Sequence, residues 1–551
     1  MKFNHLNVPD QWQHYWTRYP EGYTILEAII SWVSQVDDMV DNQNNLNEKV
    51  AQFRTEIDAF ISRFDDRLKD EVTKTLSDWQ ASGFLDIVIN EAIDTKYHEM
   101  DNRITAQLAK TEDRMKLLSY KKYGEIQLPS DFNHDINFRI WRDADGKIKH
   151  NFDIDNYLSG YTEFYISENG NNTNDGKSEQ TPFLSLSHAI DIIEADPSVS
   201  SAKINVMDSL SRNRTLTTRT ITKNYYLYAE NETYIGGIEG GLVWSKQSNG
   251  LYRAAENIPV AVYDSKFKVE FGLPYKYEKV NNVSQCLAKK GSWYTDGTYT
   301  YINRLDGSQP NNDIYVALAI ATFDITFGAD CMLAMKNITI INGNIGRANY
   351  FHSDTTTQGK MILDNVKAIK NGGDGDGNGL FYNNVKSIWQ FNCGVSDTSS
   401  DGFNYHSGID GKTFVLEYEC FSHNNGLENS TGNQNATTAH DGMHVLRIGS
   451  VGTKSKGPVL ADVNGCYSII IDTTMQESTR EPYNTKASYF FDDSPSPHDT
   501  NPNGKAILIN CNGGSADTYG INCSESFKEN KITIDNFNGI NIPKDIDFNI
   551  A

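Results

Sequence analysis

Residues 330–470 repeat one pattern: a short apolar strand, a polar turn and another short strand. Successive copies read MLAMKNITIINGN (332–344), GKMILDNVKAIKNGGDGDGNGLFYNN (359–384), SIWQFNCGVSDTSSDGFNYHSG (387–408) and FVLEYECFSHNNGLENS (414–430). The apolar runs alternate with period two and are rich in β-branched and aromatic residues, which indicates strands. Repeats of about 20–30 residues without a helical period predict a solenoid of stacked coils.

The composition suits an elongated β-protein and restricts its partners. The 551 residues exceed what one core usually spans, so we expect several structural units. The net charge of −22 argues against nucleic acid as a partner. The sequence has no apolar run long enough to cross a membrane and no N-terminal signal pattern, so it predicts synthesis in a cytoplasm. The seven scattered cysteines are expected to be small buried core residues.

The N-terminal part predicts an attachment segment followed by a stalk. Residues 1–24 are too aromatic for a free tail, so they pack on the next helix or dock into a larger assembly. Residues 25–118 are predicted to be helical. Between residues 46 and 64 the apolar positions are spaced by four and three residues in turn, which is the coiled-coil repeat. An oligomeric stalk is therefore expected, with an intramolecular helical hairpin as the alternative.

The connector at residues 119–160 is predicted to be a small β neck. Its DADGK stretch (143–147) is a hairpin signal between short alternating runs. After it, YISENGNNTNDGKSEQTPFLSLSHAIDII (165–193) gives a strand, a Gly/Asn/Asp turn and an amphipathic segment. This stretch resembles the opening of pectate-lyase-like right-handed parallel β-helix proteins, where a short helix caps the first coil. The resemblance implies a β-helix over residues 161–551.

The expected fold class is therefore mainly β. It comprises a right-handed parallel β-helix preceded by a coiled-coil stalk. An inserted β region is expected around residues 240–315, where KKGSWYTDGTYTYINRLDGSQP (289–310) reads as a hairpin. Trp293 and Tyr294 in it are predicted to stack on sugar rings. Asp376 and Tyr382 from the repeats are further candidate substrate-binding residues. The alternative for the two insert residues is a local hydrophobic cluster.

The order of aromatic tip, stalk, neck and β-helix resembles a bacteriophage tail fibre, tailspike or neck appendage. WQHYWTRYPEGYTILEAIISWVSQVDDMVDNQN (12–44) is similar to the N-terminal attachment segment of such proteins in phages of Gram-positive cocci, staphylococcal phages especially. The resemblance implies a homotrimeric virion protein, assembled in the host cytoplasm and joined to tail or neck proteins through its N-terminus. It also implies recognition of a cell-wall polysaccharide, teichoic acid or exopolysaccharide.

Three aspartates at the turns of successive coils are candidate catalytic groups. Asp397 and Asp401 lie in GVSDTSSDGFNYH, and Asp441 lies in HDGMH. A glycosidase needs two carboxylates about 5–9.5 Å apart, and neighbouring coils are spaced by about 4.8 Å. One aspartate could then serve as acid and another as base. The alternative is ordinary turn chemistry, in which Asp-Gly simply forms a corner.

Histidines and one arginine offer other chemistries at the same turns. His406, His440, His444 and Arg447 are candidate catalytic residues. A lyase needs a base and a cation that neutralises a uronate, and a teichoic-acid phosphodiester would also suit His, Asp and Arg. The turns resemble polygalacturonase motifs only faintly, because there is no Asp-Asp pair, no Gly-His-Gly and no Arg-Ile-Lys. No cofactor is required; a Ca²⁺–carboxylate cluster is an alternative to the basic groups.

Three functions follow in order of preference. The first is an appendage that binds and depolymerises a host surface glycan. The second is a receptor-binding fibre without turnover, and the third is a structural spacer. The sequence does not identify the glycan.

Overall fold

The structure, a computed structural model, describes residues 124–550 in two units. It leaves out residues 212–217, 257–258, 319–322, 343–348, 354–356, 371–376, 408–412, 427–433, 480–486, 497–501, 515–518, 525–526, 528–530 and 540–548. The predicted attachment segment and stalk (1–24 and 25–118) lie outside the described residues. One unit holds 124–127 and 138–151, and the other holds 128–137 and 152–550.

The smaller unit is a three-stranded antiparallel sheet. Its strands are β1 (Gly124–Glu125), β2 (Ile140–Arg142) and β3 (Ile148–His150). Strands β2 and β3 form the hairpin predicted at DADGK, with Ile140 opposite His150. The amide of Gly146 donates to the carbonyl of Asp143, so the Asp-Gly chemistry of the sequence closes the turn.

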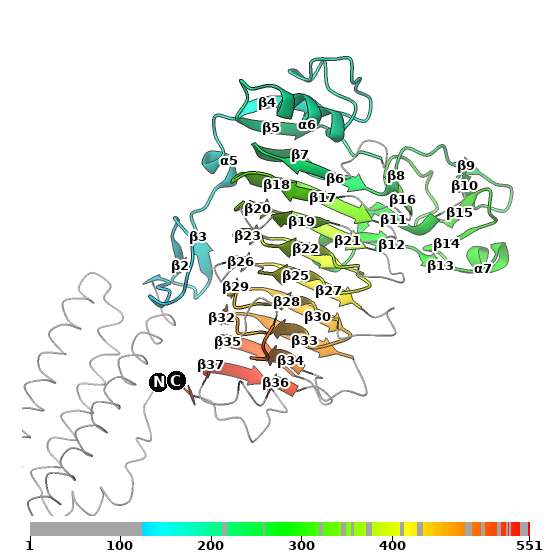
Figure 1. The fold of residues 1–551 in the computed structure, drawn as a ribbon. Helices are drawn as coiled ribbons and strands as arrows, with labels where there is room; N and C mark the ends of the chain where they lie inside the picture. Colours follow the sequence, from blue (N-terminus) through cyan, green and yellow to red (C-terminus); the bar gives the residue numbers. More distant parts are fainter. Residues whose placement is uncertain are drawn as a thin grey trace, which may run out of the picture. The chain divides into compact units, whose positions relative to one another are not determined.

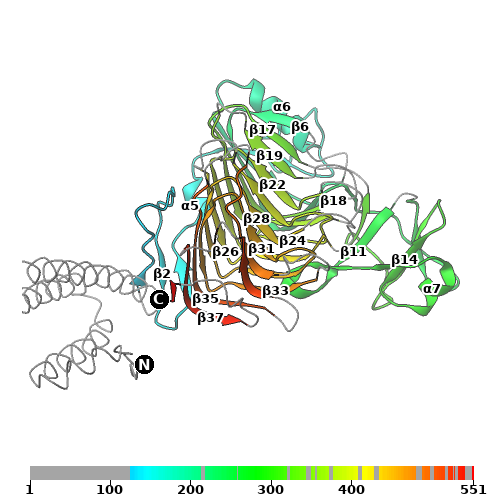
Figure 2. The same cartoon turned by 60° about the horizontal axis from the view of Figure 1, so that its bottom comes forward.

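The larger unit is a solenoid whose turns contribute strands to three parallel sheets (Figures 1 and 2). Sheet 1 contains β4 (Thr162–Ile166), β5 (Ser201–Val206), β7 (Asn224–Gly236), β18 (Met332–Asn342), β20 (Lys360–Asp364), β23 (Ser387–Phe391), β26 (Phe414–Tyr418), β29 (His444–Ile448), β32 (Tyr467–Ile471), β35 (Lys505–Gly513), β37 (Ile532–Gly539) and β38 (Asn549–Ile550). Sheet 2 contains β21 (Lys367–Lys370), β24 (Gly394–Ser396), β27 (Phe421–Asn425), β30 (Val451–Ser455) and β33 (Thr474–Ser478). Sheet 3 contains β6 (Thr218–Ile221), β17 (Asp324–Phe327), β19 (Tyr350–Ser353), β22 (Leu380–Asn383), β25 (Phe403–His406), β28 (Thr437–Ala439), β31 (Leu460–Asp462), β34 (Ala487–Phe491) and β36 (Tyr519–Cys523).

The residue pairing shows that the strands stack as coils. Met361 pairs with Ile388, and Ile388 pairs with Val415, each 27 residues further along the chain. All these ladders are parallel, as the repeats predicted. Strand β18 turns a corner, so its first half pairs with β20 and its second half with β21. Strand β35 likewise pairs with β32 and with β33, so sheets 1 and 2 share these long strands.

The corner between sheets 1 and 2 requires a left-handed backbone conformation. Asn337, Asn365 and Asn392 occupy it in three successive turns with φ of 58°, 52° and 52°. Asparagine tolerates this conformation better than most residues. The Asn365 side-chain amide donates to Asn337 Oδ1 at 2.9 Å, so the corners form a ladder of their own. The Asn-rich turns of the sequence are thus the corners of the coils.

The solenoid interior is a column of inward-facing apolar side chains. Leu333, Met361, Ile388, Val415 and Val445 are in register across five turns and are at most 3% exposed. All seven cysteines are buried and free, as predicted. Helix α6 (Leu186–Ala195) covers the first coil, with Ser185 as its N-cap. Four apolar residues of α6 are buried there, so this stretch forms the expected cap.

The region around 240–315 forms two small sheets inserted between turns, and their strands pair antiparallel except for the parallel pair β13–β14. One sheet has the order β12 (Pro274–Lys276), β11 (Pro259–Lys268), β16 (Ile314–Leu318), β8 (Ile238–Glu239). The other has the order β13 (Glu278–Lys279), β14 (Ser292–Thr295), β15 (Thr300–Asn303), β10 (Tyr252–Ala254), β9 (Ser245–Lys246), with α7 (Val283–Ala288) beside it. Phe271 stacks on Phe421 of sheet 2 at 4.6 Å, which anchors the insert to the solenoid.

The segments 128–137 and 152–157 lie along the outer face of sheet 1, and we call them the strap. Three of its carboxylates bind lysines from widely separated turns: Asp131 binds Lys505 at 2.5 Å, Asp135 binds Lys360 at 2.9 Å and Asp155 binds Lys336 at 2.5 Å. The strap ends in α5 (Ile154–Tyr157). The strap begins beside the turn that contains β35 and ends beside the turn that contains β18, and the chain then enters β4. The strap therefore crosses most turns of the solenoid. No helix in the described part of the chain is long and apolar enough to cross a membrane.

Candidate functional site

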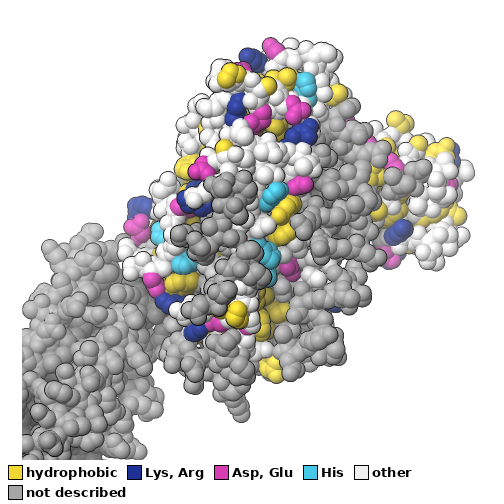
Figure 3. Space-filling model, in the orientation of Figure 1, with side chains coloured by type: hydrophobic (Ala, Val, Ile, Leu, Met, Phe, Trp, Pro, Cys, Tyr) yellow, Lys and Arg dark blue, Asp and Glu magenta, His cyan; other side chains and the backbone are white. Residues whose placement is uncertain are grey.

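The outer face of sheet 3 carries a strip of aromatic, histidine and amide side chains. On β17, β19 and β22 buried residues alternate with partly exposed ones, because successive side chains point to opposite sides of a strand. The partly exposed positions are Asp324, Thr326, Tyr350, His352, Phe381 and Asn383. Histidine and hydrophobic side chains lie together on the face that Figure 3 shows.

The first part of the strip centres on Tyr350. Its ring stacks on His352 at 4.4 Å and lies 4.8 Å from the ring of Phe381 on the next turn. The Asn383 amide donates to the Tyr350 hydroxyl at 3.0 Å. His352 Nε2 lies 2.9 Å from Thr326 Oγ1 and 3.5 Å from a carboxylate oxygen of Asp324. Apolar ring surface and hydrogen-bonding groups thus alternate along this part.

The second part brings together three residues that the sequence singled out. His406 on β25 lies edge-on to Phe381 at 5.4 Å and stacks on His440 at 4.1 Å with an interplanar angle of 9°. Asp441 Oδ2 lies 3.6 Å from His406 Nδ1. The parallel register explains this, because His406 ends its strand and His440 follows the equivalent strand one turn later.

Burial and neighbouring charge set the protonation of this cluster. Burial, together with the smaller effect of the neighbouring His406, lowers the pKa of His440 to about 3, so His440 is neutral at pH 7. Burial alone would raise the pKa of Asp441. The nearby His406 and a hydrogen bond from Ser496 outweigh burial, so the pKa of Asp441 lies below the usual value. Asp441 is therefore an ionised carboxylate beside His406, although its side chain is only 5% exposed.

The backbone conformation of Asp441 also explains why an aspartate is found at this position. Its φ is 64°, and Asn384 and Asn464 adopt the same conformation after β22 and after β31. The residue therefore forms a corner, as the turn interpretation predicted, while its carboxylate faces His406. At Asp441 the turn interpretation and the catalytic interpretation are therefore compatible.

Asp401 lies just before its sheet 3 strand, at the opposite end of the strands from Asp441, and is 8% exposed. It accepts hydrogen bonds from the Asn435 amide at 2.6 Å and from the Asn404 side chain at 3.0 Å. Burial raises its pKa to about 7, against these hydrogen bonds. Asp401 precedes β25 whereas Asp441 follows β28, so a whole strand, roughly 13 Å for four residues, separates them. The structure does not bring these two carboxylates together as a glycosidase pair.

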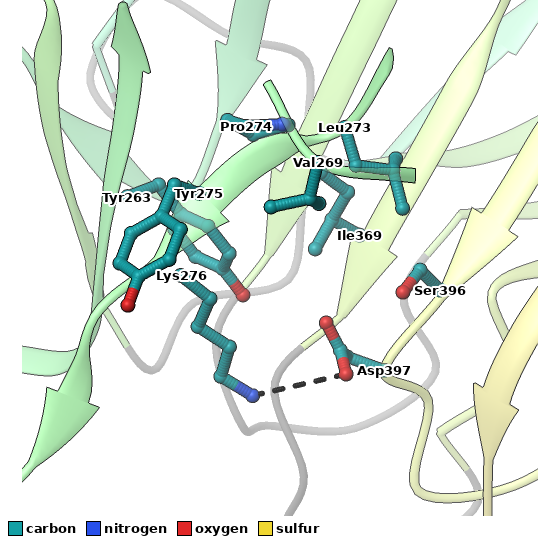
Figure 4. A pocket seen from close by; sticks show the side chains of 9 residues that line it. All are labelled: Tyr263, Val269, Leu273, Pro274, Tyr275, Lys276, Ile369, Ser396 and Asp397. Atoms are coloured by element: carbon teal, nitrogen blue, oxygen red, sulfur yellow. Dashed lines mark ion pairs between the residues drawn. The ribbon is translucent and has the colours of Figure 1, made fainter. Parts of the chain in front are cut away.

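Asp397 lies on the other side of its loop and faces the insert. It lines a cavity of about 180 Å³ with Tyr263, Tyr275 and Ile369, and its Oδ1 lies 3.9 Å from Lys276 Nζ (Figure 4). Its φ of 57° again marks a corner. Asp397 is therefore separate from the histidine cluster.

Tyr382 and Arg447 point into the solenoid. Both have 0% exposure and belong to an internal hydrogen-bond network. The Tyr382 hydroxyl donates to Gln390 at 3.1 Å, and Arg447 Nε donates to Glu417 at 3.2 Å. These side chains have no surface for a glycan to touch, and the strip does not include them.

His444 lies beneath the strap on sheet 1. Its Nδ1 accepts a hydrogen bond from the Asn133 amide at 2.7 Å, and its ring lies 5.0 Å from that of Phe132. Burial lowers the pKa of His444 to about 4, so it is neutral at pH 7. His444 and His440 do not share a face, because Gly442 and Met443 turn the chain from sheet 3 to sheet 1. Asp376 lies outside the described residues.

The two aromatic candidates of the insert face opposite ways. Trp293 is 1% exposed and packs in the core of the insert with Tyr252 and Ile302. Tyr294 is partly exposed and stacks on Tyr301 across the hairpin at 4.7 Å. Trp293 thus fits the hydrophobic-cluster alternative, and Tyr294 keeps its outward position.

Sequence reasoning passed over Tyr350, Phe381 and His352, which form the first part of the strip. The segments YFHS and LFYN carry the signal that could have identified them. In both, buried and partly exposed residues alternate, and an aromatic ring occupies a partly exposed position. Only the register between the strands places these rings next to one another on neighbouring turns. Among the described residues, no three His, Cys, Asp or Glu side chains are placed to hold a metal ion.

Comparisons with known proteins give distant likenesses only. No protein family and no curated protein matched the chain. The similar solved structures include a glycoside hydrolase with 10% identity, covering 70% of this chain and 98% of that chain at a TM-score of 0.37. A pectate lyase has 12% identity, 69% and 79% coverage and a TM-score of 0.32. The tailspike protein of Pseudomonas phage LKA1 has 14% identity, 64% and 69% coverage and a TM-score of 0.30. Scores this low carry no argument about function.

Proposed function

We propose that the outer face of sheet 3 binds a glycan of a bacterial surface and that the protein is a receptor-binding tail appendage of a bacteriophage. One observation carries the binding proposal. Tyr350, Phe381, His406 and His440 follow one another over four turns, with ring centroids 4.8, 5.4 and 4.1 Å apart. This strip runs along the solenoid axis, which suits an extended chain ligand.

The chemistry of the strip suits sugars. Aromatic rings present apolar faces to the C–H faces of pyranoses, and amides and hydroxyls serve the sugar hydroxyls as donors and acceptors. Tyr350 and Phe381 supply the rings, and Thr326, Asn383 and Asp324 supply polar groups beside them. A ligand of this kind buries ring surface without leaving polar groups unpaired.

The appendage part of the proposal rests on the sequence. The resemblance of residues 12–44 to phage attachment segments and the 3.5-residue repeat in the following helix support a trimeric stalk on a virion. A Gram-positive coccus is the proposed host. The parallel connections within each sheet favour the right-handed sense, as in nearly all parallel crossovers.

The binding proposal is tested with the full chain and the variant Phe381→Ala. Fluorescently labelled protein is titrated onto cells of a panel of Gram-positive cocci and onto their extracted surface polysaccharides. We expect the variant to bind about tenfold or more weakly, because a stacked ring contributes about 1–3 kcal/mol in comparable sites. Tyr299→Ala, which removes a ring from the insert, is the matched control. Unchanged binding by Phe381→Ala would refute the site.

A second candidate function is cleavage of the bound glycan, and the His406–Asp441 pair favours it. The carboxylate of Asp441 lies beside Nδ1 of His406, which leaves Nε2 to exchange a proton with a ligand. Stacking on His440 orients the same ring. Hydrolysis suits this pair better than uronate elimination, because Arg447, the predicted partner cation for a lyase, lies inside the solenoid.

Cleavage is tested by the release of reducing ends or phosphomonoesters from a polysaccharide that the protein binds. We expect His406→Gln to lower turnover about 100-fold or more, since a positioned acid or base contributes at least this factor. His423→Gln on sheet 2 should have no effect. If the wild type binds but releases nothing, the protein is a fibre without turnover.

A further inference from the structure

The strands of sheet 3 from β17 to β36 contain no lysine or arginine. They read DITF, YFHS, LFYN, FNYH, TTA, LAD, ASYFF and YGINC. Sheets 1 and 2 differ in this respect, since Lys336, Lys360 and Lys367 lie on their strands. Within the described part of the chain, the strands that carry the strip therefore supply no cation.

In the described part of the chain, the charged side chains on the outer face of sheet 3 are acidic or already paired. Asp324 has a side chain that is 42% exposed, and Asp441 is held ionised beside His406. Arg219, on the edge strand β6, pairs with Asp191 at 3.2 Å. The chain as a whole carries a net charge of −22. A polyanion approaching this face would meet repulsion both nearby and at long range.

We propose that sheet 3 selects a glycan that is uncharged along the stretch in contact with the strip and rejects polyanions. This inference rests on the proposed function and narrows it. Sites for carboxylates and phosphates use arginine forks or lysines, because desolvating an anion without such partners is costly. Rings, amides and hydroxyls instead match neutral sugars. Uronate polymers and phosphodiester-linked polymers are therefore poor ligands for this face.

The test uses a glycan array with neutral, uronate-containing and phosphodiester-containing bacterial oligosaccharides. Wild-type full-length protein and Phe381→Ala are compared at low and moderate salt. We expect the Phe381-dependent signals to come from neutral glycans and to change little with salt. Anionic glycans bound equally well through Phe381 would overturn the charge selection and leave the proposed binding site standing. If no signal depends on Phe381, the proposed function itself fails.

A charge-insertion variant tests the same inference from the opposite direction. Asn383 is partly exposed in the middle of the strip, and Asn383→Lys places a cation there. We expect this variant to gain about tenfold in binding to phosphodiester-containing glycans relative to neutral ones, in line with a close charge pair near a surface. Gln476→Lys on the exposed outer side of sheet 2 is the matched control and should gain nothing. Equal gains from both variants would show that general charge, rather than this face, controls selection.

Discussion

The guanidinium of Arg447 donates two hydrogen bonds, at 2.7 and 3.0 Å, to the carboxylate of Asp462 inside the solenoid. Arg447 also donates to Glu417, which accepts from Tyr405 and Thr437 as well. The inward columns that are apolar in other turns thus become polar over three turns. Every charge in this network has a partner, which is the condition under which charges are stable in a core.

Replacing Arg447 by Met should destabilise the protein by about 3–5 kcal/mol, because Glu417 and Asp462 would remain buried without their cation. Equilibrium urea denaturation followed by circular dichroism measures the free energy of unfolding. The control is Arg219→Met at the edge of sheet 3, where an exposed ion pair contributes less than about 1 kcal/mol. An equal, small loss in both variants would contradict the importance of the network.

Asp401 should make stability fall between about pH 4 and 7. Its folded pKa of about 7 lies above the unfolded value, so within this window the folded chain holds a proton that the unfolded chain has released. Stability therefore decreases as pH rises, by up to about 4 kcal/mol. Asp401→Asn should flatten this slope, because asparagine does not titrate in this range. The fold should tolerate the new amide, because Asn404 can turn its unpaired oxygen toward it. Unfolding curves across the pH range measure it, and an unchanged slope would contradict the assignment.

Asp135 should hold the strap on sheet 1. It accepts hydrogen bonds from Ser387 at 2.8 Å and from the Trp389 indole at 2.9 Å. Asp135→Ala leaves the buried indole N–H without this acceptor, at a cost of about 1–3 kcal/mol. Tryptophan emission and thermal unfolding should both shift. Asp131→Ala removes mainly an exposed ion pair and should cost about 1 kcal/mol or less, so a larger effect there would contradict this ranking.

Asn365 should be needed for its left-handed conformation. Its φ is 52°, which costs an alanine about 1–2 kcal/mol. Asn365→Ala should lower stability by this amount together with the lost hydrogen bond to Asn337. Asn365→Gly loses only the hydrogen bond, so it should be the milder variant when melting temperatures are compared. The reverse order would show that strain at this corner is unimportant.

Local patterns were sufficient for the elements of the fold. Period-two runs separated by Asn-rich turns gave the coils, because these residues prefer strands and left-handed corners whatever surrounds them. The capping helix and the 143–147 hairpin were predictable for the same reason. The stalk stays a prediction, since residues 1–123 lie outside the described part of the chain.

The candidate site was predictable only in part. His406, His440 and Asp441 were chosen for their residue types, and the register brought them together. Tyr382 and Arg447 were chosen in the same way but point inward, because one position along a strand reverses the direction of a side chain. Asp401 and Asp441 lie at opposite ends of the strands of sheet 3. Their positions in the sequence do not reveal this separation.

The sequence by itself thus determined that this chain forms short strands with Asn and Asp corners, because those preferences are local. Only the tertiary structure decided which side chains share a surface. Stacking brings residues about 27 positions apart into contact, as in the pairing of Met361 with Ile388, and alternation sends their neighbours into the core. The strip on sheet 3 exists because Tyr350, Phe381, His406 and His440 all fall on the outward side of consecutive turns.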